Sequence, residues 1–371
     1  MKITIAGDFT TEERGLKAVH EGTALSSAIR QHFIDTDISI LNLETPVADS
    51  TCRPIEKNGP CLRTEKETLA YLKSCGVDVV TLANNHFYDY GDEGVEQTIR
   101  GIEEVGLQYV GGGRNAEEVK KTLYMTVGDE RIAIINYCEG EFSIQDGIGS
   151  NHIDEISAFH DINEAKKNAD VIIVVTHGGH EYYQLPSPRM KRLYRYFVDL
   201  GAHAVVNHHQ HCYSGFEEYN GSYIFYGLGN FFFDLKSMSG TWNEGFYVEF
   251  DIHDHHISEF RIHPYKQCLA EKATVVPMSD EAEKDFEAHL EELNGIIGDD
   301  GKLQAAFHDF CESKACGYSV VFSPYSNRYM KALCKRNFLP SFFSKQRKLK
   351  ALNNIQCESH QDIMLYALKN K

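Results

Sequence analysis

The feature that most constrains this chain is a regular alternation of short apolar segments with longer, helix-like ones. The apolar segments are four to seven residues long, rich in Ile and Val, and mostly without polar alternation, which is typical of strands buried on both faces. They begin at Lys2, Asp37, Asp78, Arg131, Asp170 and Ala202. The helix-like segments between them are Thr23–Phe33, Thr64–Cys75, Glu93–Val105, Ile153–Asn168 and Arg189–Leu200. This alternation predicts an α/β domain whose sheets are covered by helices.

The pattern changes after Ser222. The segments Tyr223–Tyr226, Gly245–Ile252 and Ile257–Ile262 are joined by turns and predict antiparallel strands. From about Tyr265 onward we expect helices only, over Glu281–Leu293, Lys302–Lys314 and Ser326–Arg336. The sequence therefore predicts one domain over residues 1–264 and a helical C-terminal extension over residues 265–371.

The charge of the chain is unevenly distributed. Acids outnumber bases by 54 to 37, a formal net charge of −17, and a general nucleic-acid binder usually shows the opposite balance. Residues 331–371, however, hold nine Lys or Arg and two acids, so this tail is +7 and the remainder is −24. The bases are interleaved with Phe338, Phe342, Phe343 and Leu349. Such a tail would dock on its own acidic body, which needs no partner and is favoured, or contact an acidic polymer, a capsule-synthesis complex or anionic lipid.

The sequence predicts a cytoplasmic protein without a transmembrane segment. Its longest apolar runs, such as Val171–Val175, are only as long as strands. The N-terminus resembles a strand followed by Gly7-Asp8 rather than a signal peptide. Ten Cys residues without a C-x-x-C pair favour reduced thiols over a disulfide framework.

Polar side chains follow five of the six predicted strands, at the point where each strand ends. In α/β sheets, ligands gather beyond the carboxyl ends of the strands. A single polar residue there is usually a cap, but five such strands indicate a site. The residues are Asp8, Asn42 and Glu44, then Asn84, Asn85 and His86, then His177 and Glu181, then His208, His209 and His211.

The mixture of ligand types indicates a divalent metal site. Carboxylates favour hard cations and imidazoles favour borderline ones, so Mn, Fe or Zn are the expected occupants. In an extended segment His209 and His211 would share a face, with Gln210 directed away, and could approach one metal cluster. No Cys belongs to these motifs, which argues against a structural zinc site.

These motifs resemble those of the poly-gamma-glutamate capsule biosynthesis CapA family. The resemblance covers about residues 1–263 and implies a metallophosphatase-like, four-layer α-β-β-α sandwich, here with a C-terminal helical extension. The matching segments are Gly7-Asp8, Asn42-Leu43-Glu44-Thr45-Pro46, Ala83-Asn84-Asn85-His86 with Asp89-Tyr90-Gly91, His177-Gly178-Gly179-His180-Glu181-Tyr182, His208-His209-Gln210-His211 and Tyr226-Gly227-Leu228-Gly229-Asn230-Phe231.

The resemblance also implies a role for each site residue. Two divalent metal ions would share Glu44 as a bridging ligand. Asp8 and His211 would bind the first ion, and Asn85, His177 and His209 the second. His86 would face the substrate and act in catalysis. Glu181 is expected to be a base, a substrate contact or a structural partner of a His. Asn42, Asn84, His208 and Asn230 are expected to contact a small-molecule or anionic polymer substrate.

The chain departs from the family pattern at two positions. Gly178 stands where the family usually has Trp, which would widen the site, and Asn207 or its neighbour stands where the family has Gly. Three functions follow from the sequence. The first is a metal-dependent hydrolase for a phosphoester or an amide. The second is a non-catalytic, metal-binding component of a polymer synthesis or export complex. The third is a binding module for an acidic polymer or a nucleotide, without catalysis.

Overall fold

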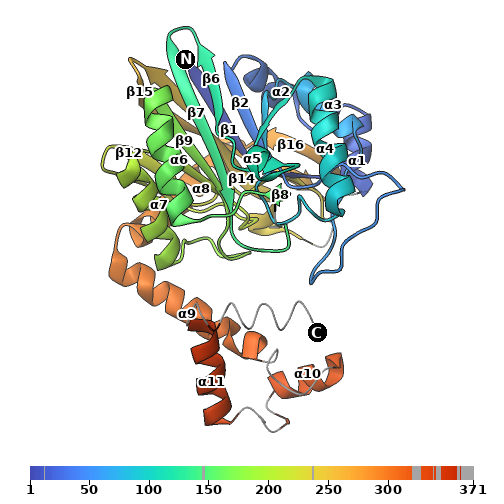
Figure 1. The fold of residues 1–371 in the computed structure, drawn as a ribbon, viewed down its shortest axis with the longest axis vertical. Coiled ribbons are helices and arrows are strands. Elements are labelled where there is room, and N and C mark those ends of the chain that lie inside the picture. The colour runs from blue at the N-terminus through green and yellow to red at the C-terminus, as the bar shows by residue number, and fades with distance from the viewer. Residues whose placement is uncertain are drawn as a thin grey trace. The chain divides into compact units, whose positions relative to one another are not determined.

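The computed structural model describes most of the chain. The described residues are 1–11, 13–143, 147–235, 238–319, 327–336, 338–339, 344–356 and 360. The chain divides into two compact units, Met1–Leu303 and Gln304–Lys371. The first unit contains both large sheets (Figure 1).

The first sheet has eight strands in the order β16-β15-β14-β1-β2-β3-β4, and β13 pairs with the end of β1. Neighbours from β1 to β4 are parallel, whereas β14, β15 and β16 continue the sheet antiparallel. The strands are β1 (Lys2–Thr10), β2 (Ile38–Leu43), β3 (Val79–Thr81), β4 (Gln108–Val110), β13 (Asn230–Phe233), β14 (Glu244–His253), β15 (His256–Leu269) and β16 (Lys272–Pro277).

The second sheet has six strands in the order β11-β12-β10-β9-β7-β6, with a parallel centre and antiparallel edges. They are β6 (Leu123–Val127), β7 (Glu130–Cys138), β9 (Val171–His177), β10 (Ala204–His208), β11 (Phe216–Tyr219) and β12 (Ser222–Phe225). A small antiparallel pair joins β5 (Gly112–Gly113) to β8 (Gly149–Ser150).

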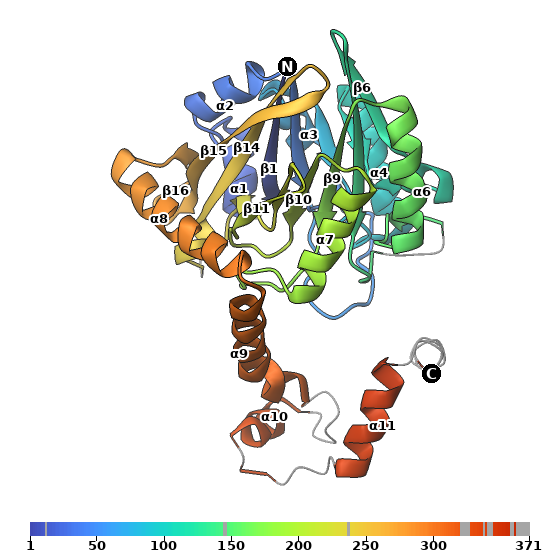
Figure 2. The ribbon, with the colours of Figure 1, turned by 90° about the vertical axis from the view of Figure 1, so that its left-hand side faces the viewer.

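Helices cover the outer faces of the two sheets (Figures 1 and 2). The first sheet is covered by α1 (Glu13–His20), α2 (Ser27–Ile34), α3 (Glu67–Ser74) and α4 (Gly91–Val105). The second is covered by α6 (Glu155–Asn168) and α7 (Pro188–Leu200), while α5 (Ala116–Val119) and the 3-10 turn η1 (Gly240–Asn243) are short. The predicted four-layer α-β-β-α arrangement is confirmed.

The central strands are apolar along their whole length because they lie between a helical layer and the other sheet. Every residue of β2 and of β9 is buried. A parallel strand buried on both faces has no polar face, so its sequence shows a continuous Ile and Val run. These runs predicted the strands correctly.

The first unit extends beyond the expected boundary at residue 264. That boundary falls inside β15, and β16 follows as the edge strand of the first sheet. Next comes α8 (Asp280–Ile297), which buries Phe286, Leu290, Leu293 and Ile297. The strand signal was missed because β16 has only a short apolar segment, Val275-Val276, beside polar residues. The unit ends at Leu303.

The second unit is helical in its described residues. It contains most of α9 (Asp300–Ser319), together with α10 (Arg328–Lys335) and α11 (Lys345–Gln356). Phe342 and Phe343, which belong to the predicted basic and aromatic tail, lie outside the described residues. None of the helices described has the length and apolar character needed to cross a membrane.

Candidate metal centre

The centre is built where β1 and β2 end beside β13. Asp8 pairs with Asn42 of β2 and with Asn230 of β13, and the pairing register of β1 shifts next to it. Such an irregularity re-aims a side chain. Gly7 must be glycine because a Cβ there would overlap the carbonyl oxygen of Gly229. The close approach of β1 to the segment before β13 therefore places the Asp8 carboxylate at the edge of the sheet.

The second sheet supplies the histidines. His177 ends β9 and pairs with His208, which ends β10. His208 is directed toward the first sheet, since its Nε2 lies 3.0 Å from the carbonyl oxygen of Ala6. His208 thus contacts backbone, and its expected substrate contact stays a prediction.

The segment after His208 is not extended, contrary to expectation. His209 has φ 93° and His211 has φ 57°, in the left-handed region that non-glycine residues rarely adopt. Their rings nevertheless lie 6.0 Å apart, and Gln210 is directed away, donating to the carbonyls of Tyr183 and Leu185. The two histidines therefore converge through backbone strain, which commonly gathers at functional sites.

Two groups of buried side chains share Glu44. In each group, one ligand atom of every residue lies within 4.8 Å of the others. One group is Glu44, His177 and His209; the other is Asp8, Glu44 and His211. This is the same division between two ions that the family resemblance implies.

The distances between ligand atoms suit a metal better than direct hydrogen bonds. Glu44 Oε1 lies 3.6 Å from His177 Nε2 and 3.8 Å from His211 Nε2. His209 Nδ1 and His177 Nε2 lie closer together, at 3.1 Å, which is also within hydrogen-bond range. Ligands bonded to one ion at about 2.0–2.2 Å are separated by similar distances, whereas hydrogen bonds are mostly shorter than about 3.2 Å.

Two asparagines complete the arrangement. Asn85 Oδ1 lies 3.0 Å from His177 Nε2, so the amide belongs to the same group. His211 Nδ1 donates to Asn230 Oδ1 over 2.9 Å, and Asn230 Nδ2 donates to the carbonyl oxygen of His211. Because Asn230 fixes the proton on Nδ1, Nε2 of His211 keeps its lone pair toward Glu44.

The electrostatics of the centre call for a cation. Burial raises the pKa of Asp8 to about 7 and raises the pKa of Glu44, and Glu44 Oε1 is buried without a hydrogen-bond partner. Burial also lowers the pKa of His177, His209 and His211, so these imidazoles are neutral with lone pairs available. Two buried carboxylates beside neutral imidazoles are the donor set that a divalent ion compensates.

His86 lies outside both ligand groups. Its Nδ1 is 2.6 Å from Asp89 Oδ2, and Lys57 Nζ lies 3.3 Å from the same nitrogen while forming an ion pair with Asp89. The Lys57 side chain is only 4% exposed, so this charge pair is part of the interior. Sequence reasoning missed Lys57 because its loop carries no pattern, although Asp89 stands three residues after His86.

The remaining predicted residues have distinct positions. Asn42 Nδ2 donates to Asp8 Oδ1 over 2.7 Å, and Asn84 Nδ2 donates to the carbonyl of Leu43. Both amides therefore position other site residues, and their contact with substrate stays a prediction. Glu181 is exposed; its negative charge adds to the effect of burial that raises the pKa of Glu44, and it partly opposes the effect of burial that lowers the pKa of His209.

The space beside Gly178 is filled rather than widened. A Cβ at Gly178 would lie 2.6 Å from Cγ of Glu139, whose carboxylate accepts from the Gly179 N–H and forms an ion pair with Arg189. Asn207 is the other departure from the family pattern. Its side-chain amide accepts hydrogen bonds from Thr176 and Tyr194 and donates to the carbonyl oxygens of Gly178 and Tyr226.

Comparison with solved structures finds chains whose backbones are similar to that of this chain over part of its length. A novel phosphatase from Mycoplasma pneumoniae is 13% identical with a TM-score of 0.46, covering 76% of this chain and 96% of that one. A 5'-nucleotidase from Candida albicans is 13% identical with a TM-score of 0.44, covering 71% of this chain and 51% of that one.

Comparison of sequences gives closer relatives. The capsule biosynthesis protein CapA of Bacillus anthracis is 38% identical over 181 residues, 47% of this chain and 44% of that protein. The PGA biosynthesis protein CapA of Bacillus subtilis is 32% identical over 229 residues, 60% of this chain and 59% of that protein. The alignments thus span about half the length of these relatives. Residues 2–235 match the family described as "Bacterial capsule synthesis protein PGA_cap", which confirms the resemblance seen in the motifs. The chain belongs to this family of bacterial capsule synthesis proteins.

Proposed function

We propose that this chain is a metal-dependent hydrolase with a dinuclear centre, acting on a phosphoester or an amide in the synthesis of poly-gamma-glutamate or another surface polymer. The capsule connection is supported by family membership and by the names of the relatives. The observation that carries the proposal is the sharing of Glu44 by two buried ligand groups.

The two groups fit two divalent ions, and Mn, Fe or Zn suits their mixed oxygen and nitrogen donors. Asp8, Glu44 and His211 would hold one ion, and Glu44, Asn85, His177 and His209 the other. When bound, two such ions would supply the site with a hydroxide at neutral pH and with polarisation of the attacked group. Asp8 and Glu44 supply the negative charge of the centre, while Asn42 and Asn230 hold the orientation of their neighbours.

His86 would give the leaving group its proton. Asp89 accepts the Nδ1 hydrogen bond and so leaves Nε2 as the nitrogen that exchanges a proton with the substrate. Proton transfer by a positioned group typically contributes about 100- to 10,000-fold in rate. Lys57 holds Asp89 in place through its buried ion pair.

One observation supports a second candidate, a metal-binding component of a polymer synthesis complex without turnover. The negative charges of Glu139, Glu141 and Glu181 all act on His209, and Lys57 and Arg189 are already paired with carboxylates. Without bound ions, this surrounding negative charge disfavours an anionic substrate and favours a neutral amide or binding without catalysis. Two divalent ions would offset this charge for a phosphoester.

Hydrolysis by the purified full chain tests the proposal. With Mn²⁺ added, we expect hydrolysis of an aryl phosphate or of a γ-glutamyl anilide, lost in His86→Asn with metal content unchanged. His160→Asn, on the exposed face of α6, is the matched control and should keep full activity. A chain that binds metal but hydrolyses neither probe would favour the second candidate, and a chain that binds no metal would exclude both.

A further inference from the structure

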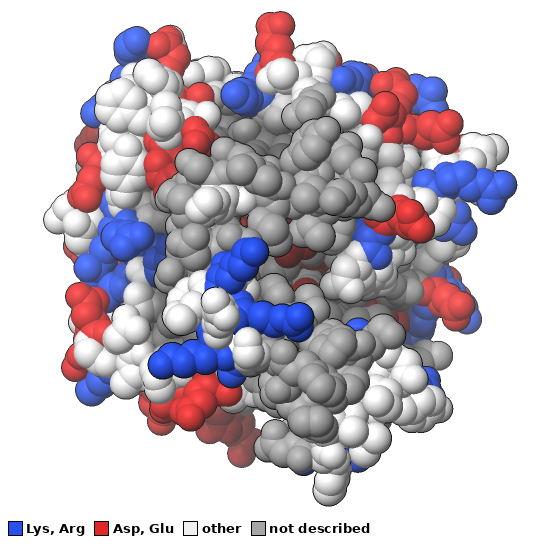
Figure 3. All heavy atoms as spheres, turned by 60° about the horizontal axis from the view of Figure 1, so that its bottom comes forward, with Lys and Arg blue, Asp and Glu red and all other residues white. Residues whose placement is uncertain are grey.

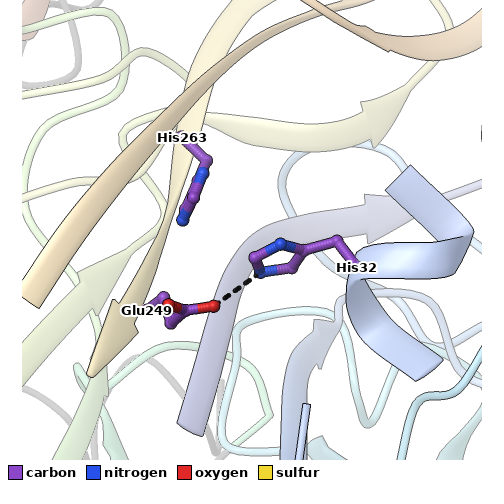
Figure 4. A group of neighbouring side chains, drawn as sticks. All are labelled: His32, Glu249 and His263. Carbon is purple, nitrogen blue, oxygen red and sulfur yellow. Dashed lines mark ion pairs between the residues drawn. The ribbon is translucent and has the colours of Figure 1, made fainter. Parts of the chain in front are cut away.

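A second group of metal-ligating side chains lies away from the centre described above. It consists of His32 from α2, Glu249 from β14 and His263 from β15 (Figure 4). His32 Nε2 lies 3.2 Å from Thr4 Oγ1, and Thr4 precedes Asp8 by four residues on β1. At about 3.3 Å per strand residue, the group is therefore roughly 13 Å along the strand from Asp8.

The spacing of this group suits one ion. Each residue offers a ligand atom within 4.8 Å of the other two, and the two rings and the carboxylate point toward one another (Figure 4). His32 Nε2 lies 3.4 Å from Glu249 Oε2. A tetrahedral ion with bonds of about 2.0–2.1 Å separates its ligands by roughly this distance.

His263 provides a second, independent observation. Its Nε2 is buried and has no hydrogen-bond partner among the described residues. A buried nitrogen in this state loses its hydration without compensation, which costs free energy. A metal ion between His263, His32 and Glu249 would bind that nitrogen.

The surrounding side chains hold the group in place. Glu249 Oε1 accepts from Lys2 Nζ at 3.0 Å and from Arg261 Nη1 at 2.8 Å, which leaves Oε2 toward the histidines. Tyr247 packs against both rings, with centroids 4.7 Å from His32 and 4.8 Å from His263. Ligands with fixed partners of this kind are typical of metal sites.

The charge around the group permits a cation. Lys2 and Arg261 oppose one, but Arg261 also pairs with Asp251 and Glu259. Three carboxylates thus face two bases. Burial lowers the pKa of both His32 and His263, which keeps the imidazoles neutral. His32 Nε2 would exchange its hydrogen bond with Thr4 for the ion.

We propose that His32, Glu249 and His263 bind one zinc-class divalent ion, with a fourth position for water, and that this ion fastens α2 to the β14–β15 hairpin. Two imidazoles and one carboxylate are a known ligand set for zinc with an open position. The His32 side chain is 20% exposed, so the ion can enter from solvent.

Zinc binding to the full chain tests this site. The chain is stripped with a chelator, dialysed against Zn²⁺ and analysed for bound metal per chain. We expect His263→Gln and Glu249→Gln each to bind one equivalent fewer than the unaltered chain. His253→Gln, an exposed residue at the end of β14, is the matched control and should lose none.

The same measurement in a His209→Ala/His211→Ala background separates this site from the proposed catalytic centre. In that background we expect one bound equivalent of zinc per chain. This equivalent should be lost when His263→Gln is added, with the circular dichroism unchanged. Equal zinc content with and without His263→Gln, in both backgrounds, would overturn the proposal whatever the fate of the hydrolase. If the His263→Gln chain does not fold, the zinc content with and without Glu249→Gln tests the site in the same way.

Discussion

In the proposed metal centre, Asn230 would influence the affinity for the ion without binding it. Its Oδ1 accepts the Nδ1 proton of His211, which aims the opposite nitrogen at Glu44. Losing such a partner typically weakens metal binding by about 10- to 100-fold. We therefore expect Asn230→Ala to bind Mn²⁺ about 10-fold or more weakly in equilibrium dialysis. Asn163→Ala, at a half-buried position of α6 outside the centre, is the control, and equal affinities for both variants would contradict the role.

Asp8 makes the stability of the metal-free protein depend on pH. Burial raises its pKa to about 7, so the folded state binds this proton more tightly than the unfolded state does. The contribution of Asp8 to stability is therefore largest below about pH 4 and is lost as the pH rises from about 4 to 7. With chelator present, the free energy of unfolding of Asp8→Asn should exceed that of the unaltered chain by a few kcal/mol at pH 8, and by less at pH 5.

Urea unfolding at several pH values measures this difference. Asp129→Asn, in an exposed turn, has the same change of charge outside the centre and should show no such trend. Adding Mn²⁺ should remove the penalty, because a cation compensates the buried carboxylate. A difference between Asp8→Asn and the unaltered chain that stays constant with pH would show that Asp8 is not the group responsible.

The site residues that could be predicted from the sequence are those that stand at the end of a predicted strand. Asp8, Glu44 and His177 follow buried runs, and the carboxyl edge of a parallel sheet must gather them. Lys57 and Glu139 could not be predicted, because a loop or an ion pair brings each to the site from segments without periodicity. The prediction that His209 and His211 lie on one face of an extended segment was also wrong. A left-handed backbone at both residues brings their rings together.

At the scale of elements, α8 is part of the first unit rather than of the extension. Phe286 is buried, and its ring centroid lies 4.4 Å from that of Tyr213 and 6.0 Å from that of Phe246. Asn294 accepts from the Phe216 N–H over 2.7 Å, which ties α8 to β11. The helix could be predicted from its spacing of apolar residues, but its attachment could not, because that depends on which face of the sheet remains uncovered.

This attachment predicts a stability effect. Replacing Phe286 with Ala removes a buried aromatic side chain and should lower the free energy of unfolding by about 3 kcal/mol. Glu287→Ala, on the exposed face of the same helix, should change it by less than about 0.5 kcal/mol. Denaturant unfolding of both variants measures the contrast, and similar stabilities would show that α8 contributes little to the core.

Truncation of the chain after residue 264 tests the same attachment by removing whole elements. It lacks the end of β15, all of β16 and α8, so the first sheet loses its edge and part of its cover. We expect residues 1–303 to fold cooperatively and residues 1–264 to remain unfolded or aggregate. Cooperative unfolding of the shorter chain would restore the boundary that the sequence predicted.

At the scale of the whole molecule, the charge is divided along the chain. Figure 3 shows both Lys and Arg side chains and Asp and Glu side chains at the surface. Residues 327–356 contain eight Lys or Arg and no Asp or Glu. The described part of this segment also exposes large apolar side chains, among them Tyr329, Phe338 and Leu349. Basic helices with exposed apolar residues favour an anionic lipid surface.

We therefore expect the full chain to sediment with vesicles containing phosphatidylglycerol and not with purely phosphatidylcholine vesicles. Each base near such a surface contributes about 1 kcal/mol, so binding should weaken steeply as salt is raised above physiological ionic strength. Lys345→Glu/Lys348→Glu, in α11, should abolish sedimentation. Lys120→Glu/Lys121→Glu has the same change of charge at exposed residues outside the tail and should not. If no vesicle binds the unaltered chain, the alternative favoured by the sequence gains support: the acidic remainder of the chain, at −24, neutralises the tail and no membrane partner is needed.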